Sequence, residues 1–482
     1  MSYKAPPLAM IVFFALTFSI HASTYLEVGD SSYTLLQRLE GEGVISSALL
    51  ATKPLSRHEI ARLLTEAEAS PNRERPGISA TIAELRRRFP ATTGSGLTFT
   101  AVDTLYGRYL YADGKPTPLV YNNAGDEYAS GSNGRLGVSG RMESPWLSLQ
   151  YTPELRHDQQ RDTVKGRELY AVLQLGPLDL LAGRISQWWG PGYHGATLLS
   201  NNADPFDQVL LTNPQAIKLP WLGPFRFVAF ATRLENDRID VAHPYLWGIR
   251  LTAKPVPEME VGVQRTAMLG GNGYSNGINT WWRSFTTKGE HLEGESGDQR
   301  GSVDLKLTLP FEVQPLQLYG EVGAEDSRHG APYKYAYLGG LFLTRLAGLR
   351  QLQLRGEIAN NHVSGRPNVW YNHHRYFQGY SYRGEIIGHH MGSDSRDYFA
   401  EASWLFPDDI SRLTFSYDHE HHNLSFAPQE EKSEYRLSAL LLAMPHLEVS
   451  PSWSFARLSD EGNRAGQSRK LNLFSLEARY RF

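Results

Sequence analysis

The sequence predicts an all-β fold, a transmembrane antiparallel β-barrel of about 18 strands preceded by a small periplasmic α-helical module. Three observations support this prediction. Apolar and polar residues alternate with a period of two from Leu97 to the C-terminus, short connections alternate with long ones, and the chain begins with an export-like segment. A large barrel forms one structural unit, so the length of 482 residues does not require several domains.

The composition fits an exported β protein with many turns. The chain has 44 Gly, 25 Tyr and no Cys, and its net charge is −3. The negative mean hydropathy excludes a helical membrane protein. A net charge near zero argues against a surface that binds polyanions, so we expect no nucleic-acid partner. Without disulfides, stability has to come from another source, such as a closed hydrogen-bonded sheet.

Residues 1–22 are predicted to be a secretory signal peptide. Lys4 supplies the positive charge, and residues 8–20 form an apolar run that is too short to span a bilayer comfortably. We expect cleavage after Ala22, although Ile20 is larger than the residue usual at that position. The alternative is an uncleaved anchor. Export and a barrel together predict a location in the cell outer membrane, in contact with its lipid.

Residues 23–96 are predicted to form the helical module and its linker. Ser56 and Glu59 make a capping box that begins one helix, and residues 31–39 predict another. Residues 78–89 predict a third helix, which Pro90 ends. The linker is the flexible stretch 92–96 (TTGSG). We expect the module to lie beneath the barrel in the periplasm, where polysaccharide export machinery is a candidate partner.

Residues 97–482 are predicted to form the barrel. In one representative strand, Val303 and Leu305 alternate with Asp304 and Lys306. A soluble sandwich buries such an apolar face, whereas a membrane barrel turns it to lipid. The connections favour the barrel, because outer-membrane barrels have tight periplasmic turns and long outer loops. The tight turns lie at 144–145, 176–177, 253–257, 309–314, 345–349, 407–410 and 444–445, and the long loops at 112–133, 157–166, 269–300, 361–395, 419–432 and 458–470.

The alternation of short and long connections also determines the number of strands. With one uninterrupted loop from 186 to 224, every later tight turn falls on the wrong side of the membrane. A strand at about 208–218, closed by a tight turn at 220–224, restores the order. The strand number then becomes even, as in single-chain bacterial barrels, and both chain ends lie on the periplasmic side.

The last segment of the chain has the form of an assembly signal. Aromatic and apolar residues alternate with polar ones, and the chain ends on Phe482 with Tyr480 two residues earlier. Such a strand resembles the signal that outer-membrane assembly machinery recognises. An ordinary edge strand that ends in Phe is the alternative, which the export signal and the loop asymmetry disfavour.

The outer loops combine aromatic residues with amide and charged side chains, most densely in the irregular insert at 187–207. Aromatic rings can stack on the apolar face of a sugar, amides and carboxylates can bind its hydroxyls, and Arg can bind a uronate carboxylate. We therefore expect the loops to bind extracellular polysaccharide; packing of the loops into the lumen as a plug, or an interfacial aromatic girdle, are the alternatives. The glycan-binding candidates are Trp188, Trp189, Tyr193, Asn201, Asn202, Asp204, Trp281, Trp282, Arg283, Trp370, Arg375, Asp394 and Arg396.

Signs of catalysis and of metal binding are weak. Residues 273–277 fit Gly-x-Ser-x-Gly around Ser275, but their flanks predict a flexible polar loop instead of the strand and helix that a nucleophile elbow requires. The histidine pairs 373–374, 389–390 and 421–422 are expected at the surface of outer loops, because no carboxylate pattern completes a site. We expect no catalytic residue, no cofactor and no bound metal.

Two motifs resemble the capsule assembly protein Wzi family. The first comprises Gly183-Arg184, the WWGPG run at 188–192 and the LLSNNA run at 198–203; the second is GHHMGSDSRDY at 388–398. The resemblance covers nearly the whole mature chain and implies an outer-membrane barrel that acts as a lectin for capsular polysaccharide. We expect a non-enzymatic barrel that binds such polysaccharide and helps to assemble or retain it. The alternatives are a porin-like diffusion channel and an outer-membrane serine hydrolase that uses Ser275.

Overall fold

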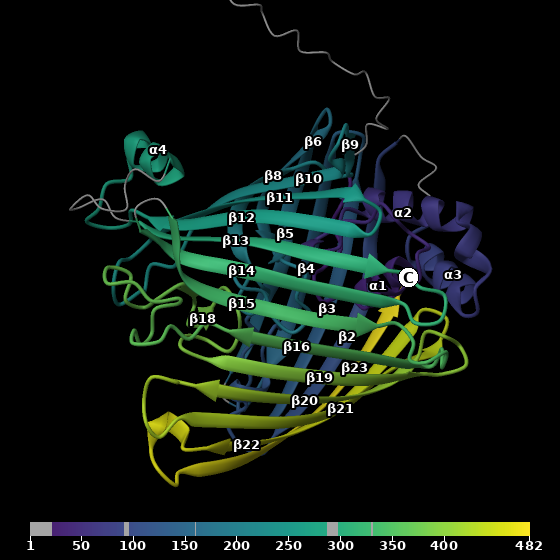
Figure 1. The fold of residues 1–482 in the computed structure, drawn as a ribbon. Helices are drawn as coiled ribbons and strands as arrows, with labels where there is room; N and C mark the ends of the chain where they lie inside the picture. The colour runs from purple at the N-terminus through teal and green to yellow at the C-terminus, as the bar shows by residue number, and fades with distance from the viewer. Residues whose placement is uncertain (1–21, 91–95, 160, 287–296, 329–330) are drawn as a thin grey trace, which may run out of the picture.

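The computed structural model describes residues 22–90, 96–159, 161–286, 297–328 and 331–482. Within these ranges the chain folds as a closed antiparallel β-barrel of 18 wall strands with a few helices, as the sequence predicts (Figure 1). No helix in these ranges is both long enough and apolar enough to cross a bilayer. The predicted signal peptide lies almost wholly outside the described residues.

The strands follow one another around the barrel, and the last pairs with the first, since β23 lies beside β2. The wall is formed by β2 (Thr98–Ala112), β3 (Gly131–Glu143), β4 (Leu147–His157), β5 (Asp162–Leu175), β6 (Leu178–Ile185), β8 (Phe206–Thr212), β9 (Ile217–Leu219), β10 (Gly223–Arg233), β11 (Tyr245–Val256), β12 (Met259–Leu269), β13 (Asp298–Leu309), β14 (Leu316–Arg328), β15 (Ala331–Leu343), β16 (Leu352–Asn360), β19 (Arg396–Leu405), β20 (Arg412–His422), β21 (Glu430–Met444), β22 (Leu447–Ser459) and β23 (Ser468–Arg481).

The strand inferred from loop parity at 208–218 is present, in two pieces. Both β8 and β9 pair with β10, so they form one wall strand that is interrupted between Thr212 and Ile217. Asn213 bridges the interruption: its side-chain amide donates to the carbonyl oxygens of Gln215 and Phe225 and accepts from the N–H of Phe227. A side chain thus replaces ladder hydrogen bonds where the strand breaks.

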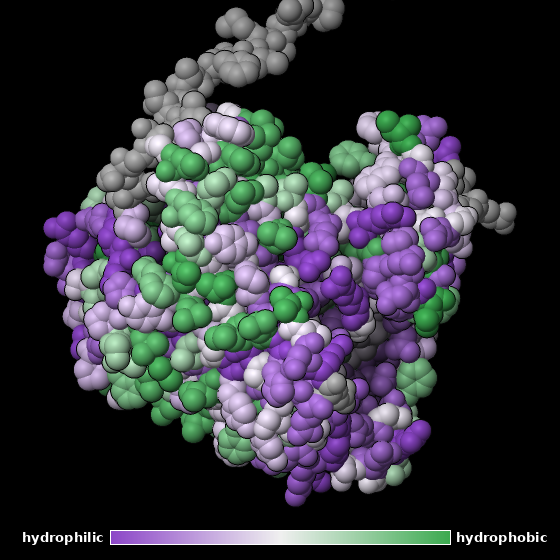
Figure 2. Space-filling model, turned by 180° about the vertical axis from the view of Figure 1, so that it is seen from behind, coloured by the Kyte–Doolittle hydropathy of each residue, from purple (hydrophilic) through white to green (hydrophobic). Residues whose placement is uncertain are grey.

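The two faces of the wall differ as the alternation predicts. On β13, Val303 and Leu305 are 54% and 40% exposed, whereas Asp304 and Lys306 are buried on the lumen side. The lumen holds paired charges, such as Arg250 Nη1 at 2.6 Å from Asp304 Oδ2. In Figure 2, hydrophobic residues gather over the barrel wall and hydrophilic residues gather towards its two ends. This arrangement suits a lipid-facing exterior and a polar interior.

The predicted helical module is present, with α1 (Ser32–Gly41), α2 (Arg57–Ala69), the single 3₁₀ turn η1 (Pro71–Glu74) and α3 (Ile78–Arg88). Ser56 caps α2 by accepting a hydrogen bond from the N–H of Glu59, which confirms the first half of the capping box. The module sits at the end of the barrel that carries the tight turns and the C-terminus (Figure 1).

Charged side chains of the module enter the barrel and form buried ion pairs with its wall. Glu40 lies 2.8 Å from Lys254 Nζ and 2.9 Å from Lys306 Nζ, and Arg88 contacts Glu448. Burial alone would raise the pKa of Glu40, but the two ammonium groups outweigh it and hold that pKa below its usual range. The module therefore closes this end of the barrel; the predicted linker lies almost wholly outside the described residues.

One loop differs from the sequence prediction. The region after Gly277 was expected to be a flexible polar loop, but it contains the helix α4 (Ile278–Thr286). The helix packs its Trp281 and Phe285 rings against Tyr245 and Trp247 of β11, and Trp247 Nε1 donates to Ser284 Oγ at 3.0 Å. A helix this short is not stable by itself, so the aromatic surface on the outside of the wall stabilises it.

Candidate functional site

Two long loops at the end opposite the module fold inwards and pack inside the barrel. We call them the plug and define it as residues 186–205 and 361–395. In the first loop, Trp188-Trp189 forms the short strand β7, which pairs with β1 (Thr52–Lys53) of the N-terminal module. Trp189 is 0% exposed and lies edge-on to Phe230 of the wall at 5.4 Å between ring centroids. Segments from both ends of the barrel therefore meet inside it.

The wall provides space for the plug at two glycines. A Cβ on Gly248 would lie 2.8 Å from the Trp189 ring, and a Cβ on Gly323 would lie 2.7 Å from the Trp370 ring. Trp370 is fully buried, and its Nε1 donates to the carbonyl oxygen of Lys334 at 3.1 Å. These contacts are closer than a Cβ tolerates, so larger residues would push the tryptophans out of their slots.

Hydrogen bonds connect the two plug loops to each other. Ser200 Oγ donates to the carbonyl oxygen of Gly388 at 2.6 Å, and Asn202 Nδ2 donates to that of Ile386 at 3.0 Å. Tyr371 Oη donates to the carbonyl oxygen of Thr197 at 2.7 Å. The two sequence motifs, almost 200 residues apart, are thus one packed unit.

The predicted site residues separate into a buried and an exposed group. Trp188, Trp189, Asn202, Asp204, Trp370 and Asp394 are each less than 5% exposed, and Asn201 is 8% exposed. Trp282, at 65%, has a ring open to solvent, whereas Tyr193, at 38%, has Arg355 stacked over its ring at 3.7 Å. Trp281 and Arg283 share α4 with Trp282, Arg375 stacks over Tyr274 at 4.2 Å, and Arg396 begins β19. The buried tryptophans pack the plug, and a sugar cannot stack on them unless the plug moves.

At the outer surface, a polar cavity of about 290 Å³ opens between the plug and the β4–β5 hairpin. Arg161, Lys165 and Arg383 line it together with the ring of Tyr382, and the acidic residues Glu127, Asp158 and Glu385 share the lining. Asp204 lies at its base, with Oδ1 at 2.7 Å from Lys165 Nζ and Oδ2 at 2.6 Å from Arg383 Nη1. Arg161 is paired with Glu127 at 3.4 Å, but the side chains of Arg161 and Arg383 are 61% and 45% exposed, so part of each guanidinium group faces solvent. We call Arg161, Lys165, Tyr382 and Arg383 the basic mouth.

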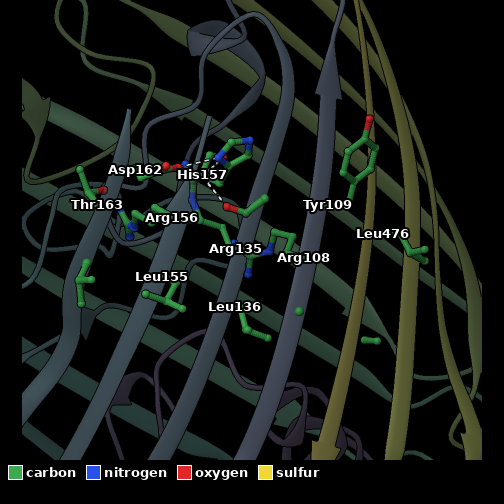
Figure 3. A pocket seen from close by; sticks show the side chains of 14 residues that line it. Arg108, Tyr109, Arg135, Leu136, Leu155, Arg156, His157, Asp162, Thr163 and Leu476 are labelled. Atoms are coloured by element: carbon green, nitrogen blue, oxygen red, sulfur yellow. Dashed lines mark hydrogen bonds and ion pairs between the residues drawn. The ribbon is translucent and has the colours of Figure 1, made fainter. Parts of the chain in front are cut away.

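A larger cavity, of about 730 Å³, lies on the outside of the wall (Figure 3). Leu136, Leu155, Val164 and Leu476 line it between β2, β3, β4, β5 and β23. Small residues at Gly107, Gly134 and Ala478 form its floor. Its apolar lining belongs to the lipid-facing surface of the barrel, so it offers little to a hydroxyl-rich ligand.

Asp204 is one of the candidates that the sequence predicts, but its basic partners are not. Lys165 and Arg161 lie in the hairpin at 157–166, which has no aromatic residue to draw attention, and Arg383 lies well after the second tryptophan region. Only the folded loops bring the three cations together. The net charge of the chain gives no signal either, because acidic residues, several of them in the same cavity, balance these cations.

The histidine pair at 389–390 was expected at the surface, and this expectation is wrong. The side chains of His389 and His390 are 2% and 3% exposed, beside His194 of the other plug loop. Burial lowers the pKa of His389 well below its ordinary value. Burial also acts to lower the pKa of His390, but the nearby carboxylates of Asp397 and Glu420 outweigh it and raise that pKa to about 10.

Comparisons with known proteins agree with this architecture. A family model described as capsule assembly protein Wzi matches residues 107–473. The fold is similar to that of Wzi from Escherichia coli, described as an outer membrane protein involved in group 1 capsule assembly and a carbohydrate-binding β-barrel: 19% identity, TM-score 0.76, and coverage of 95% of this chain and 100% of that chain.

Two further proteins are similar to this chain. OprD of Pseudomonas aeruginosa is 9% identical, with a TM-score of 0.50 over 80% of this chain and 94% of that chain. An uncharacterized 55.8 kDa protein in the cps region of Klebsiella pneumoniae is 26% identical over 313 residues, which are 63% of this chain and 58% of that protein. The match thus spans less than two thirds of that relative.

Proposed function

Because the chain belongs to the capsule assembly protein Wzi family, we propose that it is a non-enzymatic outer-membrane barrel that binds extracellular polysaccharide at its loop end. It would help to assemble or retain this polymer at the cell surface. The observation that carries the proposal is the basic mouth on a barrel whose own loops pack inside its lumen.

The chemistry of the basic mouth favours a polysaccharide with acidic sugars. Guanidinium groups bind carboxylates through two parallel hydrogen bonds, and Arg161 and Arg383 lie on opposite loops around one cavity. Tyr382 adds an aromatic face beside Arg383, against which a sugar ring can pack. One such subsite binds weakly, but a repeating polymer can engage many molecules at once, and this multivalency raises the overall affinity.

The packed plug argues against a diffusion channel. Trp189, Trp370 and Tyr371 are each at most 1% exposed inside the lumen, where a channel would need water-filled space. The likeness to OprD concerns the fold alone. Conductance in planar bilayers separates the two functions: we expect no large steady current, whereas a stable open pore would support the channel.

The hydrolase alternative has little support in the geometry. Ser275 precedes a helix, but its Oγ shares a hydrogen bond with Thr280 Oγ1 at 2.8 Å, and within the described residues no histidine contact accompanies it. A nucleophilic serine needs a base within hydrogen-bond reach. If Ser275→Ala lowered any ester-hydrolysing activity of the pure protein, the non-enzymatic proposal would fail.

The cellular setting follows from the same proposal. A signal peptide at 1–22 would direct export, the module at 23–96 would lie in the periplasm, and the barrel at 97–482 would contact outer-membrane lipid. The strand ending in Tyr480 and Phe482 would be recognised by the outer-membrane assembly machinery. The module's outer face would be available to polysaccharide export machinery.

A binding experiment with purified protein tests the glycan proposal. Arg161→Glu and Arg383→Glu should each weaken binding of an acidic capsular polysaccharide by about tenfold or more, because each removes charge-assisted hydrogen bonds and adds repulsion. Arg464→Glu makes the same charge change in an exposed position of another outer loop and should leave binding unchanged. Equal affinity for all three variants and the wild-type protein would remove the basic mouth from the proposal.

A further inference from the structure

A cluster of potential metal ligands lies inside the barrel, and none of its members lines the basic mouth. Two plug loops and two adjacent wall strands, β19 and β20, contribute to it. Subsets of three of its side chains have one ligand atom each within 4.8 Å of one another. The members are His194, His389, His390, Asp397, Asp418 and Glu420.

The distances within the cluster are those of ligands around an ion. His194 Nε2 lies 3.4 Å from Asp418 Oδ1 and 3.6 Å from Asp397 Oδ2. His390 Nε2 lies 3.4 Å from the same Asp397 oxygen. A tetrahedral Zn²⁺ with bonds of about 2.0–2.1 Å holds its ligand atoms about 3.3–3.5 Å apart.

These buried atoms lack the hydrogen bonds that a structural role would require. Within the described part of the chain, His194 Nε2, both ring nitrogens of His390, Asp397 Oδ2 and Asp418 Oδ1 make none. Their side chains are between 3% and 6% exposed. Buried polar atoms are almost always satisfied, and those left over point to a ligand that the protein atoms do not supply.

The imidazole rings are held in place before any ion binds. Tyr121 stacks on His390 at 4.2 Å between ring centroids, and Phe399 stacks on His194 at 4.0 Å. The backbone N–H of His194 donates to Glu357 Oε1 at 3.1 Å, which fixes the loop behind the ring. Supporting contacts of this kind orient the ligands of metal sites in proteins.

The carboxylates of the cluster differ in their partners outside it. Lys432 lies 2.9 Å from Asp418 Oδ2 and 2.5 Å from Glu420 Oε1, and His422 Nε2 lies 2.7 Å from Glu420 Oε2. Glu420 is thus already paired twice, whereas Asp397 Oδ2 and Asp418 Oδ1 face the imidazole rings. Buried carboxylates are costly unless they are paired or coordinate a metal.

We propose that His194, His390, Asp397 and Asp418 bind a divalent transition-metal ion of the Zn²⁺ class, with His389 and Glu420 beside them. Two imidazoles and two carboxylates suit such an ion better than Mg²⁺ or Ca²⁺, which prefer oxygen ligands alone. The ion would join both plug loops to β19 and β20, and so would hold the plug in the lumen. This site is independent of polysaccharide binding at the basic mouth.

The test uses the full mature chain, purified in detergent, treated with a chelator and then dialysed against Zn²⁺. Metal content measured by mass spectrometry should rise to about one ion per chain, with X-ray absorption showing nitrogen and oxygen ligands at about 2.0–2.1 Å and imidazole scattering. His194→Ala and His390→Ala should each weaken Zn²⁺ binding by more than about tenfold.

Two controls keep the result specific. His374→Ala changes an exposed histidine of the same plug loop and should leave Zn²⁺ binding intact. Heat-modifiable mobility on gels shows that each variant is folded, and Asp418→Asn serves as a milder variant that keeps the side-chain volume. Folded wild-type protein without bound Zn²⁺, or Zn²⁺ binding that His194→Ala and His390→Ala leave unchanged, would overturn the proposal.

Discussion

At the scale of single residues, the plug depends on the absence of side chains at certain wall positions. Gly323 faces Trp370, and Gly248 faces Trp189, at distances that leave no room for a Cβ. The sequence shows these glycines only as interruptions of strand patterns, which usually mark bulges or close approach. The structure identifies the close approach and names the partner ring in each case.

We predict that Gly323→Val loosens the plug. The new side chain meets the Trp370 ring, and overpacking of this kind costs about 1–3 kcal/mol. The tryptophan emission should shift to longer wavelength, and the temperature at which the plug unfolds should fall. Gly356→Val is the matched control, because a Cβ there meets nothing closer than 3.9 Å. If Gly323→Val, like Gly356→Val, left the unfolding temperature of the plug unchanged, the close packing of Trp370 against Gly323 would be contradicted.

A second prediction concerns Glu40, which Lys254 and Lys306 bind inside the barrel. Its pKa is lowered in the folded protein, so its contribution to stability is present above about pH 4.3, the ordinary Glu value, and is lost as the pH falls. Glu40→Gln leaves buried ammonium groups without this partner and should destabilise the docked module by about 3–5 kcal/mol at pH 7.

The measurement is thermal unfolding of the wild-type protein and of Glu40→Gln between pH 3 and pH 7. The difference between them should shrink towards acid pH, as wild-type Glu40 becomes protonated. Glu68→Gln removes a partly exposed ion pair with Arg86 and should change stability by less than about 1 kcal/mol. A difference between wild type and Glu40→Gln that did not depend on pH would show that Glu40 is not ionised in the folded protein.

At the scale of elements, the alternation of tight turns and long loops predicted the wall correctly. It even required the strand at 208–218, which the structure shows as β8 and β9. It succeeded because strand period and turn length are local properties of the chain. The break at Asn213 and the helix α4 were not predicted, because each depends on contacts with a neighbouring strand.

We predict that α4 lies at the membrane interface. Its Ile278, Trp282 and Phe285 side chains are 85%, 65% and 50% exposed. The helix lies at the loop end of the barrel (Figure 1), where its Trp281 and Phe285 rings contact Tyr245 and Trp247 of β11. Tryptophan favours the interface between lipid and water. Brominated lipids should therefore quench the fluorescence of wild-type protein in vesicles more strongly than that of Trp282→Phe. The fluorescence of Trp189→Phe, which changes a ring in the lumen, should be quenched as strongly as that of the wild type. A loss of quenching in Trp189→Phe alone would contradict the placement of α4 at the interface.

At the scale of the whole molecule, both ends of the barrel are closed by different parts of the chain. The N-terminal module enters from the tight-turn side, and the plug enters from the loop side, where β7 pairs with β1. The sequence could indicate outer loops rich in aromatic residues, but it left their direction open. Whether Trp188 and Trp189 face solvent or the lumen depends on pairing with residues more than 100 positions away, which no local pattern encodes.

The same limit applies to the sites. The aromatic residues draw attention to the loop end of the barrel, but the binding residues proposed there, Arg161, Lys165 and Arg383, are ordinary loop cations in the sequence. The buried histidines likewise come together only when two loops fold against β19 and β20. A packed plug and an exposed basic mouth together favour a barrel that holds a polymer at its surface over one that conducts solutes.

The most direct test of this account measures the ratio of cell-bound to released capsular polysaccharide. A strain that produces the Arg161→Glu, Arg383→Glu double variant at wild-type level should release polymer as a deletion strain does, while its total polymer stays unchanged. The Arg464→Glu strain should retain polymer like wild type. Retention by the double variant at the wild-type level, with retention lost in the deletion strain, would contradict a role for the basic mouth; retention in the deletion strain as well would contradict the proposed function.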